Sequence, residues 1–221
     1  METIAGREVC TTLDEVLHPK HTALIVVDMQ NDFCAAEGLW GRLGVDLAMS
    51  RAIIPAMQSL LDAARAAAVP VIYIQMTNLP DMGAQSPTRI RYGVLKLKLK
   101  LDQVICSVGS WGANVIAEIA PRPDELVIRK WRYSAFDGTP LDQVLRSRGI
   151  QTVLLCGTTT SVCVESAARD AFAHDYYTVV ATDCVSDIRR DWHEASLLLM
   201  QSRVDLVNSP EIKQIWQSAR R

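Results

Sequence analysis

Three residues whose types suit acid–base and nucleophilic chemistry stand at or just beyond the ends of short apolar runs. Asp28 closes TALIVVD, Lys130 closes ELVIRK, and Cys163 follows TVLLCG by a few residues. A thiol nucleophile needs a base that takes its proton and a cation that keeps this base ionised. No Cys/His motif is present in the sequence, so we expect Asp28 to be the base and Lys130 its cationic partner.

Each of these residues also has a purely structural interpretation when it is considered alone. A free cysteine is most often a small buried apolar residue, and Cys34 and Cys184 also lie near the ends of apolar runs. Asp28 could cap a helix or form a surface salt bridge, and Lys130 could lie in solvent at a strand end. The combination favours chemistry, but the residue types leave the choice of nucleophile open.

The segment around Cys163 has the pattern of a strand end followed by a helix. Thr160 or Ser161 could cap this helix, whose first turn would then carry the thiol. Backbone N–H groups at a helix N-terminus favour a thiolate. We therefore expect the pKa of the Cys163 thiol to be lowered.

Six apolar runs alternate with longer segments of helical period. The runs are TALIVVD (22–28), PVIYIQM (70–76), ELVIRK (125–130), TVLLCG (152–157), YTVVATD (177–183) and RVDLV (203–207). This alternation predicts a doubly wound α/β fold, a three-layer sandwich in which helices cover both faces of a six-stranded, mainly parallel sheet. With the strand order 3-2-1-4-5-6, the first and fourth strands flank the switch point, where Asp28 and Cys163 would meet.

Two segments do not fit this alternation. Residues 77–93 are rich in turn formers and longer than an ordinary connection, so they form either a lid over the site or a mobile loop. The sequence VLKLKLKLD (94–102) alternates with the period of a half-exposed strand, although an amphipathic edge or a subunit contact would have the same pattern.

Composition limits the classes of partner. With 221 residues, 49% hydrophobic residues and a formal net charge of -2, the chain fits one domain (1–221) with an N-terminal extension (1–20). The sequence has no basic stripe for nucleic acid and no apolar run for a signal peptide or a membrane span, so we expect a cytoplasmic protein. Its six scattered cysteines suggest free thiols.

Three segments resemble the signature blocks of the isochorismatase-like cysteine hydrolase superfamily, and the resemblance extends from about residue 20 to the C-terminus. They are ALIVVDMQNDFC (23–34), VIRKWRYSAFDGTPLDQVLRSRGI (127–150) and GTTTSVCVESAARDAF (157–172). The resemblance implies a triad of Asp28, Lys130 and Cys163. It also implies a cis peptide between Thr158 and Thr159 and an oxyanion hole formed by the N–H groups of Thr159 and Cys163.

Within the superfamily, the last two blocks and GSWGANVIAEIAP (109–121) are most similar to ureidoacrylate amidohydrolase and other hydrolases of carbamoyl groups. This similarity implies a cysteine-dependent amidohydrolase that cleaves a linear amide or ureido C–N bond through a thioester-type intermediate and releases ammonia. The substrate would be a ureidoacrylate, an N-carbamoyl compound or a biuret-like molecule. The resemblance also makes a homo-oligomer, a dimer or tetramer, plausible.

Other functions remain as alternatives. Nicotinamidases carry a DxH metal site where this chain has QMTNLPD (75–81), so we expect neither a metal nor a cofactor. Isochorismatases of the vinyl ether type lack the nucleophilic cysteine. A nicotinamidase-like or isochorismatase-like hydrolase is therefore the second hypothesis, and a receiver-like signalling domain is the non-enzymatic one.

Substrate contacts are predicted from residues near the triad or in the candidate lid. Gln30, Asn78 and Tyr133 could bind polar groups of the substrate. A guanidinium suits a substrate carboxylate, and the arginines near the site are Arg89, Arg91 and Arg132. A neutral compound such as biuret would need none of these arginines.

Overall fold

The computed structural model describes residues 1–96, 100 and 103–219. Its centre is a six-stranded sheet in which every neighbouring pair of strands is parallel. The strands are β3 (Thr22–Val27), β4 (Val71–Met76), β5 (Leu126–Lys130), β6 (Thr152–Thr158), β7 (Tyr177–Ser186) and β8 (Asp205–Val207). Their order is β5-β4-β3-β6-β7-β8, which is the predicted 3-2-1-4-5-6 when the sheet's own strands are counted.

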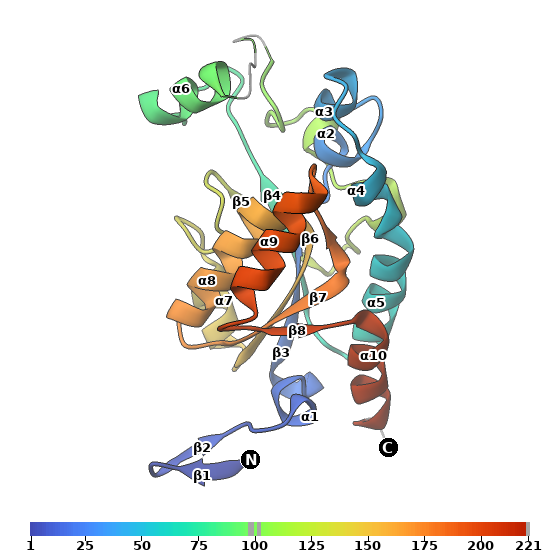
Figure 1. Ribbon diagram of the computed structural model, residues 1–221, viewed down its shortest axis with the longest axis vertical. Helices are drawn as coiled ribbons and strands as arrows, with labels where there is room; N and C mark the ends of the chain where they lie inside the picture. Colours follow the sequence, from blue (N-terminus) through green and yellow to red (C-terminus); the bar gives the residue numbers. More distant parts are fainter. Residues whose placement is uncertain (97–99, 101–102, 220–221) are drawn as a thin grey trace.

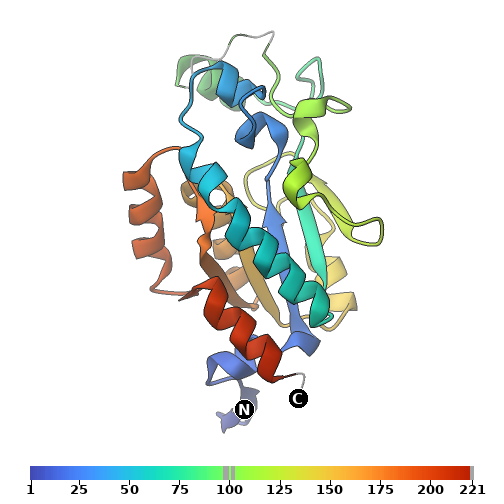
Figure 2. The same cartoon turned by 90° about the vertical axis from the view of Figure 1, so that its right-hand side faces the viewer.

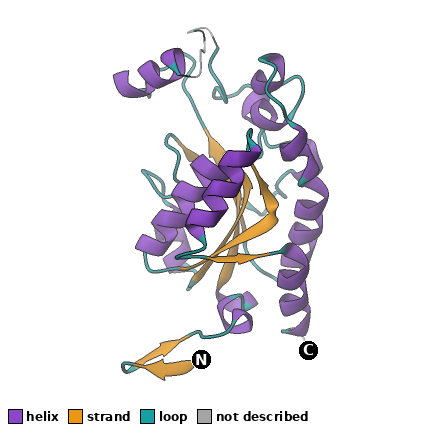
Figure 3. Cartoon of the chain, in the orientation of Figure 1, coloured by secondary structure: helices purple, strands orange, loops and turns teal. Residues whose placement is uncertain are grey.

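Helices cover both faces of the sheet, so the predicted doubly wound, three-layer α/β fold is confirmed (Figures 1 and 3). One layer contains α7 (Leu141–Ser147), α8 (Glu165–Ala173) and α9 (Arg190–Met200). Figure 2 faces the other layer, which is formed mainly by α5 (Ile54–Ala66) and α10 (Ser209–Ser218).

Continuous apolar runs form the central strands because both of their faces are covered. Every residue of β3 and β6 is buried. Leu24 and Leu154 belong to the core cluster under α5 and α10, whereas Ile25 and Leu155 belong to the cluster under α8. Successive side chains of a strand therefore contribute to opposite layers, as expected for a buried parallel sheet.

The remaining elements are short and lie at the two ends of the sheet. At the amino ends of the strands, the hairpin β1 (Glu2–Ile4) and β2 (Arg7–Val9) extends away from the body and leads into α1 (Leu13–Val16) (Figure 1). At the carboxyl ends lie α2 (Asn31–Cys34), α3 (Leu39–Arg42) and α6 (Pro87–Leu95), and α4 (Ala48–Ala52) leads back toward α5. Short 3-10 turns cover Pro19–His21, Trp111–Ala113 and Ala117–Ile119.

Of the interpretations of residues 94–102, the half-exposed strand is wrong where the structure describes the segment, because Val94 and Leu95 belong to α6. Pro87 at the first turn and Ser86, whose hydroxyl accepts the Arg89 N–H, begin this helix. Ser86 and Pro87 precede the alternating segment, so its pattern alone does not indicate a helix. Residues 97–99 and 101–102 lie outside the described residues, and Lys100 is not in a strand.

No helix in the described ranges combines the length and the apolar character needed to span a bilayer.

Gly157 allows β6 to approach β3 closely just before Asp28. It pairs with Val27 in the sheet, and its φ of +114° is one that side chains rarely adopt. A Cβ atom at this position would lie 2.1 Å from the Val27 carbonyl oxygen, which is far inside van der Waals contact. Val27 directly precedes Asp28, so the close approach at Gly157 also helps to fix the position of the Asp28 backbone.

We predict that Gly157→Ala destabilises the protein more than Gly149→Ala does. Gly149 also has a positive φ, +67°, but a Cβ there meets nothing within 4 Å, so its substitution costs only the conformational strain, about 1–2 kcal/mol. At Gly157 the collision adds roughly 1–3 kcal/mol. Urea unfolding of both variants measures the difference, and equal losses would contradict the close approach.

Candidate active site

The three residues predicted as a triad lie together at the carboxyl edge of the sheet. Asp28 follows β3, Lys130 is the last residue of β5, and Cys163 lies in a single-turn π-helix (Thr160–Val164) that follows β6. Strands β3 and β6 are neighbours, whereas β5 is separated from β3 by β4. The long Lys130 side chain spans that separation, passing the end of β4 with its Nζ 4.0 Å from Met76 Sδ.

Asp28 and Lys130 form a buried ion pair. Asp28 Oδ2 lies 2.8 Å from Lys130 Nζ, and the side chains are 1% and 0% exposed. The other oxygen, Oδ1, accepts the Met76 N–H at 3.0 Å. In the part of the chain that the structure describes, Oδ2 accepts no hydrogen bond of regular geometry. This oxygen therefore keeps accepting capacity inside the site.

The Lys130 ammonium is held by several oxygens and one sulfur. It donates to the carbonyl oxygens of Arg132 at 3.1 Å and Tyr133 at 2.9 Å, and its Nζ lies 3.2 Å from Cys163 Sγ. Burial opposes the charge on Lys130, but the Asp28 carboxylate and the Cys163 sulfur outweigh burial and raise the pKa of the lysine. Lys130 is therefore a fixed positive charge between the carboxylate and the thiol.

Burial raises the pKa of the Cys163 thiol to about 12, and the nearby Asp28 carboxylate adds to this effect while Lys130 opposes it. The expected lowering of this pKa is therefore wrong. Neither Thr160 nor Ser161 caps the helix, since the N-cap is Thr159 and it makes no side-chain capping bond. A thiol whose pKa is raised needs a base that takes its proton when a substrate is bound.

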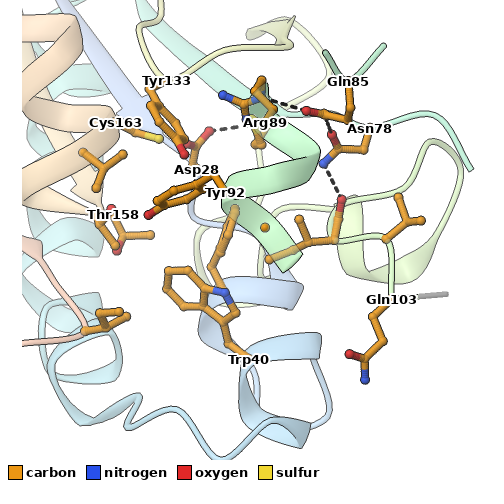
Figure 4. Close-up of a pocket in the computed structure, with 18 of the residues that line it drawn as sticks. Asp28, Trp40, Asn78, Gln85, Arg89, Tyr92, Gln103, Tyr133, Thr158 and Cys163 are labelled. Carbon is orange, nitrogen blue, oxygen red and sulfur yellow. Dashed lines mark hydrogen bonds between the residues drawn. The ribbon is translucent and has the colours of Figure 1, made fainter. Parts of the chain in front are cut away.

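A cavity of about 230 Å³ opens beside these groups (Figure 4). Asp28, Thr158, Thr159 and Cys163 all line it. Of the six cysteines, all of which the structure describes, Cys163 alone borders this cavity. The alternatives Cys34 and Cys184 are fully buried in the core under α5 and α10.

The peptide bond between Thr158 and Thr159 is cis, as the family resemblance implies. The Thr158 hydroxyl donates to the Ser186 carbonyl oxygen at 3.3 Å and also contacts the Ser186 hydroxyl. This places the end of β6 firmly beside the end of β7. The role of Thr159 and Cys163 N–H groups as an oxyanion hole stays a prediction.

The predicted substrate contacts divide into two groups. Asn78, Tyr133 and Arg89 line the cavity. Gln30 does not, because its fully buried amide donates to the carbonyl oxygens of Met76 and Ala113 and accepts the Met76 N–H. We correct its assignment to a structural role, the fixing of the segment that follows β3 to the end of β4.

The other two candidate arginines, Arg91 and Arg132, do not line the cavity. The Arg132 guanidinium donates to the carbonyl oxygens of Trp131 and Ala84, and the residue is not among those that line the cavity, so its predicted substrate contact is corrected too. Arg91 is exposed on α6. Only Arg89, one of the three arginines considered, lines the cavity wall.

Sequence reasoning missed Asp187 at the cavity wall. Its Oδ2 accepts both the N–H and the hydroxyl of Ser161, at 2.8 and 2.7 Å, and thereby holds the turn that carries Cys163. Asp187 directly follows β7, so the search for polar residues at strand ends that selected Asp28 could also have found it. It was missed because the predicted strand ended at residue 183.

No group of three or more His, Cys, Asp or Glu side chains within residues 1–96, 100 and 103–219 is arranged to hold a metal ion. The expectation that the site works without a metal or cofactor remains a prediction.

A family model described as the Isochorismatase domain matches residues 22–209. A cysteine hydrolase from Pseudomonas syringae pv. phaseolicola 1448A is 30% identical, with a TM-score of 0.78, and the match covers 91% of this chain and 95% of that one. N-carbamoylsarcosine amidase from Thermoplasma acidophilum is 28% identical over 86% and 96% of the two chains, with a TM-score of 0.67. A nicotinamidase from Bacillus subtilis is 25% identical over 85% and 99%, with a TM-score of 0.70.

The buried ion pair predicts a non-additive effect on stability. Lys130→Met leaves the Asp28 charge buried without its partner, which should cost about 3–5 kcal/mol of the free energy of unfolding. Adding Asp28→Asn removes the stranded charge, so the double variant should be more stable than Lys130→Met alone. Urea unfolding of the wild type, the two single variants and the double variant, which together form a double-mutant cycle, measures this non-additivity.

An exposed ion pair provides the control for that cycle. Arg189 and Asp191 form a pair in which both side chains are more than half exposed, and its loss should cost less than about 1 kcal/mol. Additive losses at Asp28 and Lys130 would show that the two charges do not depend on each other.

The electrostatics of the thiol predict that Asp28→Asn makes Cys163 more reactive toward iodoacetamide. The carboxylate raises the pKa of the thiol, so its removal lowers that pKa, while Lys130 remains to stabilise the thiolate. The pH profile of Cys163 alkylation, followed by mass spectrometry of the tryptic peptide, should shift to lower pH. The Cys184 peptide is the internal control: this thiol is fully buried in the core, so it should stay unmodified in both proteins, and its alkylation would report loss of the native fold. A shift of the Cys163 profile to higher pH would show that the Asp28 carboxylate does not raise the pKa of this thiol.

Proposed function

Because the chain belongs to the isochorismatase family of hydrolases, we propose that it is a cysteine-dependent amidohydrolase that cleaves a linear amide or ureido C–N bond of a small molecule and releases ammonia. One observation carries the proposal. Lys130 Nζ lies 2.8 Å from Asp28 Oδ2 and 3.2 Å from Cys163 Sγ, and both Asp28 and Cys163 line a cavity. A base, a cation and a nucleophile are thus in contact where a carbonyl compound can enter.

The first half-reaction forms a covalent acyl-enzyme. Asp28 Oδ2 takes the Cys163 proton as Sγ attacks the substrate carbonyl carbon, and the N–H groups of Thr159 and Cys163 stabilise the oxyanion. When the tetrahedral intermediate collapses, the C–N bond breaks and Asp28 gives its proton to the departing nitrogen. Ammonia leaves, and a thioester, or a thiocarbamate from a ureido substrate, remains on Cys163.

The second half-reaction consumes one water. Asp28 takes a proton from this water, whose oxygen attacks the same carbonyl carbon, and the C–S bond breaks. Sγ regains its proton from Asp28, and the product acid loses its proton to water and leaves as a carboxylate or as a carbamate. A carbamate then decays to an amine and carbon dioxide. Lys130 remains charged throughout and stabilises the anionic form of whichever partner holds the negative charge.

The relatives support a carbamoyl or amide substrate without selecting one. One structural neighbour is named for the amidase reaction on N-carbamoylsarcosine and another for nicotinamidase activity. Because the chain belongs to a hydrolase family, we no longer propose the alternative of a receiver-like signalling domain. Nicotinamide therefore belongs in the substrate panel beside ureido acids, biuret and simple amides.

We predict that Cys163→Ala lowers ammonia release from any true substrate by at least about a thousandfold, because the nucleophile is lost. Ammonia release across the panel measures this, and Cys163→Ser should be similarly impaired. Cys34→Ala is the matched control, since Cys34 is a buried cysteine that does not line the cavity. Full activity in Cys163→Ala would exclude the covalent mechanism.

A further inference from the structure

The cavity beside Cys163 is larger than a carbamoyl group needs. Its volume is about 230 Å³. An apolar cavity of roughly 150 Å³ is large enough to take up benzene. The site therefore has room for the reacting group together with a substituent of about the size of an aromatic ring.

Much of the cavity wall is aromatic or branched aliphatic. Phe33 and Trp40 pack edge to face, with ring centroids 4.6 Å apart, and both line the cavity. Ile90 of α6 and Ile188 contribute further apolar surface. Trp192 also lines the cavity and remains 44% exposed. An apolar substituent of the substrate would gain free energy by covering this surface.

Arg89 provides a cationic group on the same wall, and a chain of hydrogen bonds holds it in place (Figure 4). Its Nε donates to Gln85 Oε1 at 2.7 Å, Gln85 donates to Asn78 Oδ1, and Asn78 donates to the Ile105 carbonyl oxygen at 2.7 Å. The guanidinium carbon lies 4.7 Å from the centroid of the Tyr133 ring. The guanidinium is therefore positioned before a ligand arrives.

Lys100 also lines the cavity, and neither of the two lining carboxylates, Asp28 and Asp187, pairs with Arg89. Asp28 is paired with Lys130, and the Asp187 oxygens accept the N–H groups of Ser161 and Ile188. No carboxylate in the described ranges forms an ion pair with Arg89. Its planar guanidinium can donate two parallel hydrogen bonds to a carboxylate.

We propose that the substrate is a ureido acid that carries both a carboxylate and an aromatic or branched apolar substituent, such as an N-carbamoyl derivative of an apolar amino acid. This inference rests on the proposed function and adds the substrate class. The carbamoyl carbon lies at Cys163, the carboxylate pairs with Arg89, and the apolar substituent packs against Phe33, Trp40 and Ile188. Small neutral compounds of the biuret type leave both the guanidinium and the apolar wall uncovered.

Binding to the Cys163→Ala variant tests this inference without turnover. Four ureas separate the two features: N-carbamoylphenylalanine has both, N-carbamoylglycine has only the carboxylate, phenethylurea has only the ring, and methylurea has neither. Calorimetry should give the tightest dissociation constant for N-carbamoylphenylalanine, by at least about tenfold over each of the others. Cys163→Ser replaces Cys163→Ala if that variant does not fold.

Variants of α6 then locate the carboxylate. Arg89→Gln should reduce the preference for N-carbamoylphenylalanine over phenethylurea by on the order of tenfold to a hundredfold. Arg91→Gln, which removes an exposed arginine of the same helix that does not line the cavity, should retain the preference.

The inference is overturned if N-carbamoylphenylalanine binds no more tightly than methylurea, or if Arg89→Gln and Arg91→Gln behave alike. Ammonia release by the wild-type enzyme is a separate measurement. Release from biuret with no selectivity for the larger acid contradicts the substrate class and leaves the amidohydrolase proposal intact. Selective binding without ammonia release from any member contradicts the amidohydrolase and leaves the recognition of an amphipathic acid intact.

Discussion

The buried ion pair between Asp28 and Lys130 is the contact on which the arrangement of the carboxyl edge depends. Removing each ion from water costs several kcal/mol, which the pair recovers only when its geometry is good and its other bonding positions are filled. The Met76 N–H fills one position of the carboxylate, and the carbonyl oxygens of Arg132 and Tyr133 fill positions of the ammonium. The ends of β3, β4 and β5 must therefore lie in register. The Lys130 ammonium that pairs with Asp28 also lies 3.2 Å from Cys163 Sγ, where it can stabilise a thiolate.

The fold and the meeting of three side chains could be predicted because both follow from the order of buried parallel strands. Apolar runs show where strands end, and the right-handed crossover rule limits how they can be ordered. The choice of Cys163 over Cys34 and Cys184 needed the family resemblance, since all three cysteines lie near strand ends. The structure separates them by a property that a sequence does not contain, namely which thiol borders a cavity.

The sequence was least informative about side-chain direction and about electrostatics after burial. Gln30 looked like a polar residue beside the triad, yet its partners are main-chain groups 46 and 83 residues away. The pKa of Cys163 was expected to fall because local N–H groups favour a thiolate, but burial and the Asp28 carboxylate determine the sign. Helix α6 was missed because most of it, residues 87–93, lies in the turn-rich segment that was expected to be a lid or a mobile loop, although Ser86 and Pro87 are typical of a helix start.

The separation between α6 and the core affects how this enzyme can diverge. The helix contains no buried residue, although Arg89, Ile90 and Tyr92 from it line the cavity. Exchanges at such positions typically change the free energy of unfolding by less than about 0.5 kcal/mol. Mutations that alter this wall are therefore nearly neutral for folding, whereas mutations at Asp28 or Lys130 are not. Related proteins can therefore change substrate selectivity through substitutions in α6, while Asp28 and Lys130 stay constrained by the stability of the fold.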